Sequence, residues 1–145
     1  MKKISQGNIL LVEDSTTDAD IAMMSIRKSG LRVSVEWVSN GLEALAYLRQ
    51  AKEFDVPVDL MILDLKMPLM NGWELLGQMK EEELISFPIV VMSASEMPKD
   101  RERVFQLGAN AFYVKPYSLQ ASYKVFEQLL NQWIANKEQV YKRSG

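Results

Sequence analysis

The stretch VDLMILDLKMPLMNG, residues 58–72, decides the fold. Its apolar run, 60–63, has the length and composition of a strand that is buried on both faces of a parallel sheet. The run stops at the carboxylate of Asp64, and a proline and a glycine follow within eight residues. A strand that ends in an acid and then turns places that acid at the edge of the core, where side chains emerge.

Short apolar or alternating runs of this kind recur along the chain. They predict five strands, at 9–12, 33–37, 58–63, 89–92 and 112–114. Stretches with helical spacing separate them, and these predict helices that begin near Thr16, Gly41, Asn71, Pro98 and Leu119. The stretch 50–57 is predicted to be a loop, and the alternation at 33–37 favours a strand with one wetter face, as at a sheet edge.

Five strand-and-helix alternations predict an α/β fold. The expected architecture is a doubly wound, five-stranded parallel sheet with helices on both faces. The chain has 145 residues, which is the size of one domain, so we expect a single domain over 1–145 with its core at about 7–134. Residues 135–145 are then a helical extension or a tail.

Composition excludes several classes of function. The chain has neither cysteine nor histidine, so disulfides, thiolate metal sites and a histidine phosphoacceptor are impossible. Its net charge of −2 argues against a nucleic-acid-binding surface. The apolar run after the N-terminus, 9–12, is too short for a signal peptide or a membrane span. We therefore expect a cytoplasmic protein with no membrane and no nucleic-acid partner.

Polar residues follow four of the predicted strands directly. They are Glu13, Asp14, Asp64, Ser93 and Lys115. Because the carboxyl ends of parallel strands meet at one edge of an open sheet, we expect these side chains to gather there, where such folds bind ligands.

The gathered residues suit phosphoryl chemistry. Three carboxylates bring a charge of about −3, which a divalent cation with oxygen ligands, such as Mg²⁺, would compensate. The ammonium of Lys115 and the hydroxyl of Ser93 would complete an anion receptor around Asp64. A carboxylate in that position is a candidate nucleophile that forms an acyl phosphate.

Five motifs in this order resemble the receiver domain of two-component response regulators. They are Glu13-Asp14, Asp64 with Met67-Pro68, Asn71-Gly72, Ser93-Ala94 and Lys115-Pro116. The resemblance covers about residues 7–134 and implies a flavodoxin-like or CheY-like sheet of order 2-1-3-4-5 with five helices. It also implies a phosphorelay switch that catalyses only its own phosphotransfer and autodephosphorylation.

The resemblance assigns the central residues of the site. It implies Asp64 as phosphoacceptor and Lys115 as a contact to the phosphoryl group. It implies Mg²⁺ bound by Asp14, Asp64 and the backbone carbonyl of Lys66, with Glu13 acting through water.

The resemblance also assigns residues around that centre. Ser93 would contact the phosphoryl group and, with Phe112, form the switch, although Phe112 is equally well explained as a core aromatic residue. Lys66 and Ser95 stand where the family tunes the lifetime of the phosphoryl group. A cis peptide bond is expected before Pro116, since cis bonds are largely confined to X–Pro.

The expected partners follow from the same resemblance. The phosphoryl donor would be a sensor histidine kinase, and "GLEALAYLRQ" and "LLNQWI" are similar to single-domain regulators of phytochrome-like kinases. With only residues 135–145 beyond the receiver, output would pass to another protein or through a homodimer. An apolar stripe that continues to Val140 and Tyr141 is the reason to expect the dimer.

Two other classes of protein remain as alternatives. An aspartyl-phosphate phosphatase or phosphotransferase would usually carry a second acid two residues after its nucleophile, where this chain has Lys66. A pseudo-receiver, a binding module without phosphorylation, would be expected to lack Asp64 or Lys115, and both are present.

Overall fold

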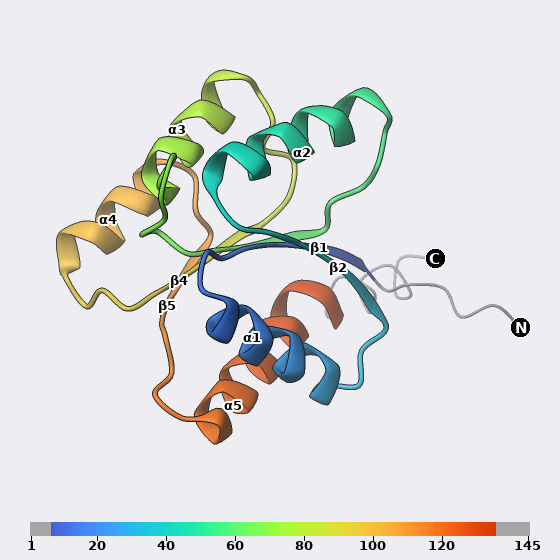
Figure 1. The fold of residues 1–145 in the computed structure, drawn as a ribbon, viewed down its shortest axis with the longest axis vertical. Coiled ribbons are helices and arrows are strands. Elements are labelled where there is room, and N and C mark those ends of the chain that lie inside the picture. The colour runs from blue at the N-terminus through green and yellow to red at the C-terminus, as the bar shows by residue number, and fades with distance from the viewer. Residues whose placement is uncertain (1–6, 136–145) are drawn as a thin grey trace, which may run out of the picture.

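The computed structural model describes residues 7–135, in which strands and helices alternate (Figure 1). The strands are β1 (Gly7–Val12), β2 (Val33–Val38), β3 (Leu60–Leu63), β4 (Ile89–Ser93) and β5 (Ala111–Val114). The helices are α1 (Thr16–Lys28), α2 (Gly41–Glu53), α3 (Gly72–Glu81), α4 (Pro98–Gln106) and α5 (Leu119–Leu130), followed by a π-helical turn, η1 (Asn131–Ala135). None of the helices in the described part is both long and apolar enough to cross a bilayer.

All four strand pairings are parallel, and the strand order is β2-β1-β3-β4-β5. Figure 1 shows α2, α3 and α4 on one face of the sheet and α1 and α5 on the other. The expected doubly wound fold with order 2-1-3-4-5 is confirmed. Strand order reverses between β1 and β3, so an open sheet of this kind has its ligand-binding crevice at the carboxyl ends of these two strands.

Side-chain alternation along the strands divides the core into two halves. Leu10 and Met61 belong to the half under α2, α3 and α4, whereas Ile9 and Leu60 belong to the half under α1 and α5. Both halves are closed to water, which explains why β1, β3 and β4 are apolar at nearly every position. Strand β2 lies at the edge and has a wetter face, as its sequence predicts.

Two predicted boundaries were wrong by a few residues. Helix α2 runs to Glu53 rather than ending near 50, and it closes with the N–H of Val56 donating to the carbonyl of Ala51. Strand β3 begins at Leu60 rather than 58. At Asp59 the side chain takes part in the pairing with β1, because its carboxylate accepts from the N–H of Asn8 at 2.7 Å. Regular backbone pairing of β3 therefore begins one residue later, at Leu60.

A buried pair of hydroxyls joins α1 to α5. The Oγ atoms of Ser25 and Ser122 are 2.9 Å apart, and both residues are buried. Ser25 also donates to the carbonyl of Ile21, so the hydrogen between the two hydroxyls comes from Ser122. Buried polar groups need partners, so this pair fixes one helix against the other.

Helix α3 begins where the chain returns to the end of β3. Asn71 caps it in a capping box with Glu74, and the N–H of Gly72 donates to the carbonyl of Leu65 at 2.8 Å. A Cβ at Gly72 would lie 2.8 Å from the Cα of Leu65 and 2.9 Å from the carbonyl oxygen of Asp64. Only glycine allows this close approach to the backbone beside Asp64.

We predict opposite effects of alanine at the two glycines of α3. Gly72→Ala forces backbone against backbone and should lower the free energy of unfolding by about 1–3 kcal/mol. Gly77→Ala, in the interior of the same helix with nothing within 4 Å, should raise it by up to about 1 kcal/mol. Urea unfolding of the two variants measures both values, and equal effects would contradict the close approach.

Candidate functional site

Backbone hydrogen bonds continue past the strand ends and fix the site residues in place. Glu13 N–H donates to the carbonyl of Val38 at 3.0 Å, and Asp64 N–H donates to that of Val12 at 3.0 Å. Lys115 N–H donates to the carbonyl of Ser93 at 2.8 Å. The sheet ladder therefore extends by one residue on each of these strands, and each functional side chain leaves from rigid backbone.

The structure brings three carboxylates together, and we call Glu13, Asp14 and Asp64 the acidic triad. One oxygen from each lies within 4.8 Å of the others. Glu13 and Asp64 are buried, whereas Asp14 is exposed, so the triad opens to solvent on one side. Carboxylate oxygens are the ligands that Mg²⁺ prefers, and the donor set and its spacing fit one such ion.

The ammonium of Lys115 lies against the acidic triad. Its Nζ is 2.8 Å from Oε1 of Glu13 and 3.2 Å from Oδ2 of Asp64. It is also 2.8 Å from Oδ2 of Asp18, in the first turn of α1. Lys115 thus meets three carboxylates, and the predicted convergence of strand-end residues is confirmed for this lysine and the triad.

Two residues at the site were not predicted from the sequence. Asp18 lies in the first turn of α1, where an acid is favoured at any helix N-terminus, so its sequence position alone does not indicate a role at the site. Trp37, at the end of β2, donates from its indole Nε1 to the backbone carbonyl of Glu13 at 2.8 Å. It thereby adds a side-chain restraint to the backbone of the acidic triad.

Burial and charge move the pKa values of Glu13 and Lys115. Burial raises the pKa of Glu13 to about 7, helped by the negative charge of Asp64 and opposed by the hydrogen bond from Lys115. For Lys115, burial lowers the pKa, but hydrogen bonds to Asp18 and Glu13 outweigh it, so its pKa lies above the usual value. Lys115 therefore stays charged. Glu13 is only partly ionised near pH 7, and an additional cation beside it would favour its ionised form.

The residues expected around this centre occupy different surroundings. Ser93 is buried at the end of β4, on the same face of the sheet as Phe112, which is partly buried against the core under α2, α3 and α4. Ser95 donates from its Oγ to Asp100 at 2.6 Å and from its N–H to the Oγ of Ser93 at 3.2 Å. The side chain of Lys66 is exposed.

The expected cis bond before Pro116 was wrong for this structure. Residues 7–135 contain no cis peptide bond, so the bond from Lys115 to Pro116 is trans. The trans form of an X–Pro bond is the more stable one by about 0.5–1 kcal/mol. With that bond trans, Lys115 contacts the carboxylates of Glu13, Asp18 and Asp64.

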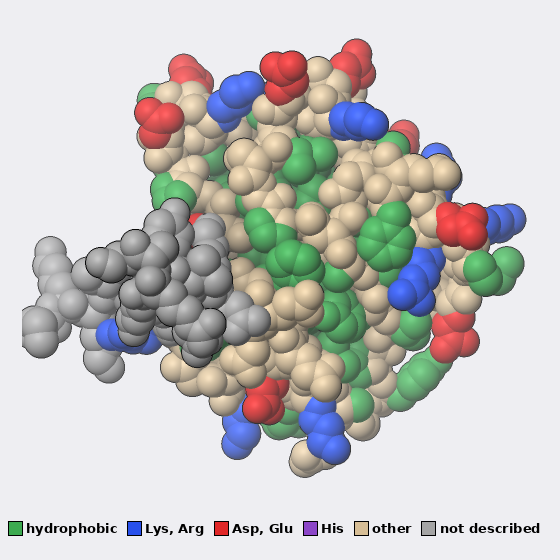
Figure 2. Space-filling model, turned by 180° about the vertical axis from the view of Figure 1, so that it is seen from behind, with side chains coloured by type: hydrophobic (Ala, Val, Ile, Leu, Met, Phe, Trp, Pro, Cys, Tyr) green, Lys and Arg blue, Asp and Glu red, His purple; other side chains and the backbone are tan. Residues whose placement is uncertain are grey.

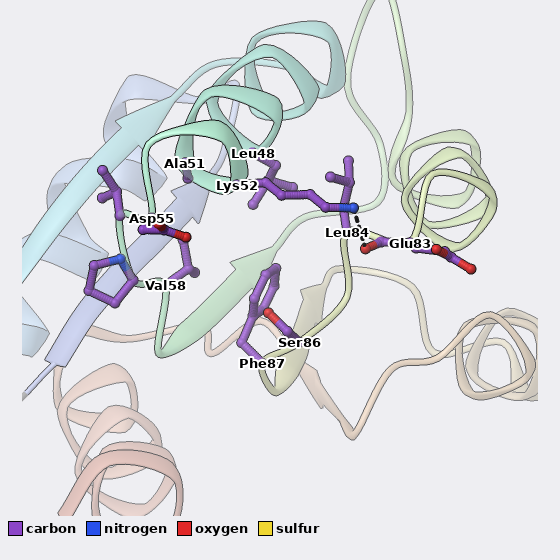
Figure 3. Close-up of a pocket in the computed structure, with 11 residues that line it drawn as sticks. Leu48, Ala51, Lys52, Asp55, Val58, Glu83, Leu84, Ser86 and Phe87 are labelled. Carbon is purple, nitrogen blue, oxygen red and sulfur yellow. Dashed lines mark hydrogen bonds between the residues drawn. The ribbon is translucent and has the colours of Figure 1, made fainter.

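A second cavity lies at the opposite edge of the sheet. It has a volume of about 430 Å³ and lies between the C-terminal ends of α2 and α3 (Figure 3). Lys52 donates across it to the backbone carbonyl of Glu83 at 3.4 Å. Leu48, Leu84 and Phe87 contribute its apolar lining. None of the triad residues reaches it, so it is separate from the acidic site.

The profile of the response regulator receiver domain matches residues 9–127, and the chain belongs to this family. Proteins of the family are signalling switches of two-component systems and accept phosphoryl groups from histidine kinases. The order of strands and the clustered acids described above are those expected of a receiver domain.

Individual relatives give a finer comparison. The chain is 32% identical over 128 residues to the probable methanogenesis regulatory protein FilR2 of Methanothrix harundinacea, covering 87% of this chain and 83% of that one. It is 29% identical over 129 residues to response regulator Rcp1 of Synechocystis sp., covering 87% and 88%. The crystal structure of the phosphorylated cyanobacterial phytochrome response regulator RcpA is similar, with a TM-score of 0.81, 29% identity and coverage of 90% and 95%.

We predict that, without divalent cations, the protein loses stability as the pH rises from 5 to 8. The unfolded glutamate ionises near pH 4.5, whereas folded Glu13 keeps its proton to about pH 7, so the folded state binds more protons in this window. The loss should be about 1–3 kcal/mol. Urea unfolding in a chelating buffer measures it, with no histidine to interfere. Glu13→Gln should flatten the dependence, and an unchanged slope in this variant would contradict the assignment.

Proposed function

We propose that this protein is a phosphorylation switch in which Asp64 is the phosphoacceptor. The supporting observation is the convergence of Asp64, the other two triad acids and Lys115 at the strand ends. Asp64 lies at the end of β3, beside the point where the strand order reverses. The exposed residue Asp14 and the ammonium of Lys115 are both close to its carboxylate. In the transfer, an oxygen of Asp64 forms a bond to phosphorus while the P–N bond of a kinase phosphohistidine breaks. The electron pair of that bond stays on the imidazole nitrogen.

The site would hold Mg²⁺ through carboxylates of the acidic triad. Asp14 and Asp64 would be direct ligands, with the backbone carbonyl of Lys66, and Glu13 would act through water. A crystal structure of Rcp1 with Mn²⁺ bound, 28% identical with a TM-score of 0.78 and coverage of 88% and 94%, supports a divalent ion in such a site. The ion would supply positive charge where the phosphoryl oxygens gather.

Ser93 and Lys115 would contact the phosphoryl group once it is attached. Ser93 would leave its hydrogen bond with the N–H of Ser95 and move toward the new anion. Phe112 lies on the same face of the sheet and would turn into the space that Ser93 vacates. Lys66 and Ser95, each two residues after a residue of the site, would set how long the acyl phosphate survives.

The output would pass through the surface of α4, β5 and α5 to another protein. This part of the molecule exposes several hydrophobic residues, namely Met97, Phe105, Val114, Tyr117 and Leu119. Figure 2 shows the molecule from behind, with hydrophobic side chains gathered across the middle of that face and charged ones around its rim. An apolar surface with a charged rim is typical of protein contacts.

The proposed kinase partner is phytochrome-like, since the RcpA structure to which this chain is similar is that of a phytochrome response regulator. A homodimer through the last helix is proposed from the continuation of its apolar stripe at Val140 and Tyr141, which lies outside the described residues. The earlier part of the stripe, Phe126, Leu130 and Ile134, is buried within the chain and would not form the contact. The mass in solution with and without fluoroberyllate tests the dimer, which a monomer under both conditions would rule out.

We predict that Asp64→Asn abolishes phosphorylation by acetyl phosphate in Mg²⁺. The amide lacks the nucleophilic oxygen, so hydroxylamine-labile phosphate should fall to background. Asp55→Asn, a change of an exposed acid at the opposite edge of the sheet, should behave as the wild type. Phosphorylation that survives in Asp64→Asn would refute the assignment, and none in the wild type would favour the pseudo-receiver.

A further inference from the structure

The Lys115 ammonium has no unused proton in this structure. Its three N–H donors face three carboxylates, those of Glu13, Asp18 and Asp64. A phosphoryl group on Asp64 adds new acceptor oxygens beside the same ammonium. The N–H that now faces Asp64 can pass to these oxygens, and Lys115 can give the phosphoryl group a second N–H only by leaving Glu13 or Asp18.

Exposure identifies which partner is released most easily. The side chains of Glu13 and Asp64 are 7% and 8% exposed, whereas that of Asp18 is 41% exposed. Glu13 would be left as a buried carboxylate without water or a partner if it lost Lys115, which is strongly unfavourable, whereas Asp64 is no longer a free carboxylate once it carries the phosphoryl group. Asp18 can be hydrated instead, so its separation from Lys115 has the smallest penalty.

We propose that Asp18 competes with the phosphoryl group for Lys115 and thereby lowers the affinity of the site for that group. The inference rests on the proposed function of Asp64. In the unphosphorylated protein, Asp18 holds the ammonium beside α1. When an anion occupies the site, the lysine exchanges Asp18 for it, and α1 loses an ionic contact to the segment that follows β5. Asp18 is thus a positioning residue that acts through Lys115.

The test measures affinity for fluoroberyllate, a phosphoryl mimic, in the full chain with saturating Mg²⁺. Asp18→Asn should bind it about 3- to 10-fold more tightly than the wild type, because one competitor for Lys115 is removed. Asp20→Asn removes the same charge from an exposed position of the same helix and should change the affinity less than about two-fold. Asp18→Glu, which keeps a carboxylate, should stay near the wild type. Calorimetry gives all four values, and a loss of structure would weaken binding rather than tighten it.

The outcomes separate this inference from the proposed function. Tighter binding in Asp18→Asn alone supports competition. Equal affinities of Asp18→Asn and Asp20→Asn overturn it, and so does weaker binding in Asp18→Asn, which would mean that Asp18 orients the lysine toward the anion. Both results leave Asp64 as phosphoacceptor. If the wild type does not bind fluoroberyllate, or Asp64→Asn binds it equally well, the proposed function itself fails.

Discussion

The structure of the site depends on the balance between one ammonium and the carboxylates around it. Burial raises the free energy of ionised Glu13 at the edge of the sheet, and Lys115 offsets part of that penalty. One lysine is too little charge for the acids that it meets. The excess negative charge would favour binding of a divalent cation. Without such a cation, the pKa of Glu13 is raised to about 7.

The fold provides the rigidity that this balance needs. Glu13, Asp64 and Lys115 each donate an N–H that continues the ladder of the sheet. Gly72 brings the start of α3 against the backbone of Asp64, and Trp37 restrains that of Glu13. Charges that repel one another can be held close only where the backbone that carries them does not move away.

The sequence pattern was sufficient for the parallel sheet and for the acids, and the resemblance to receiver domains supplied the strand order, but neither identified the neighbours of the acids. Apolar runs that end in Glu13, Asp64 and Lys115 identify the edge of a parallel sheet without any knowledge of contacts. The partnership of Asp18 with Lys115 spans 97 positions, and no local pattern contains it. The start of β3 was misplaced for a similar reason, since Asp59 pairs with the distant residue Asn8.

The serine pair between α1 and α5 has a consequence for how motion would travel. Sliding either helix along the other by one turn would deprive the buried hydroxyl of Ser122 of its hydrogen bond to Ser25, so this contact favours a single register of the two helices. A displacement that starts at Lys115 and moves one of the two helices would then move the other helix with it. The surface that α1 and α5 form would shift as a single unit.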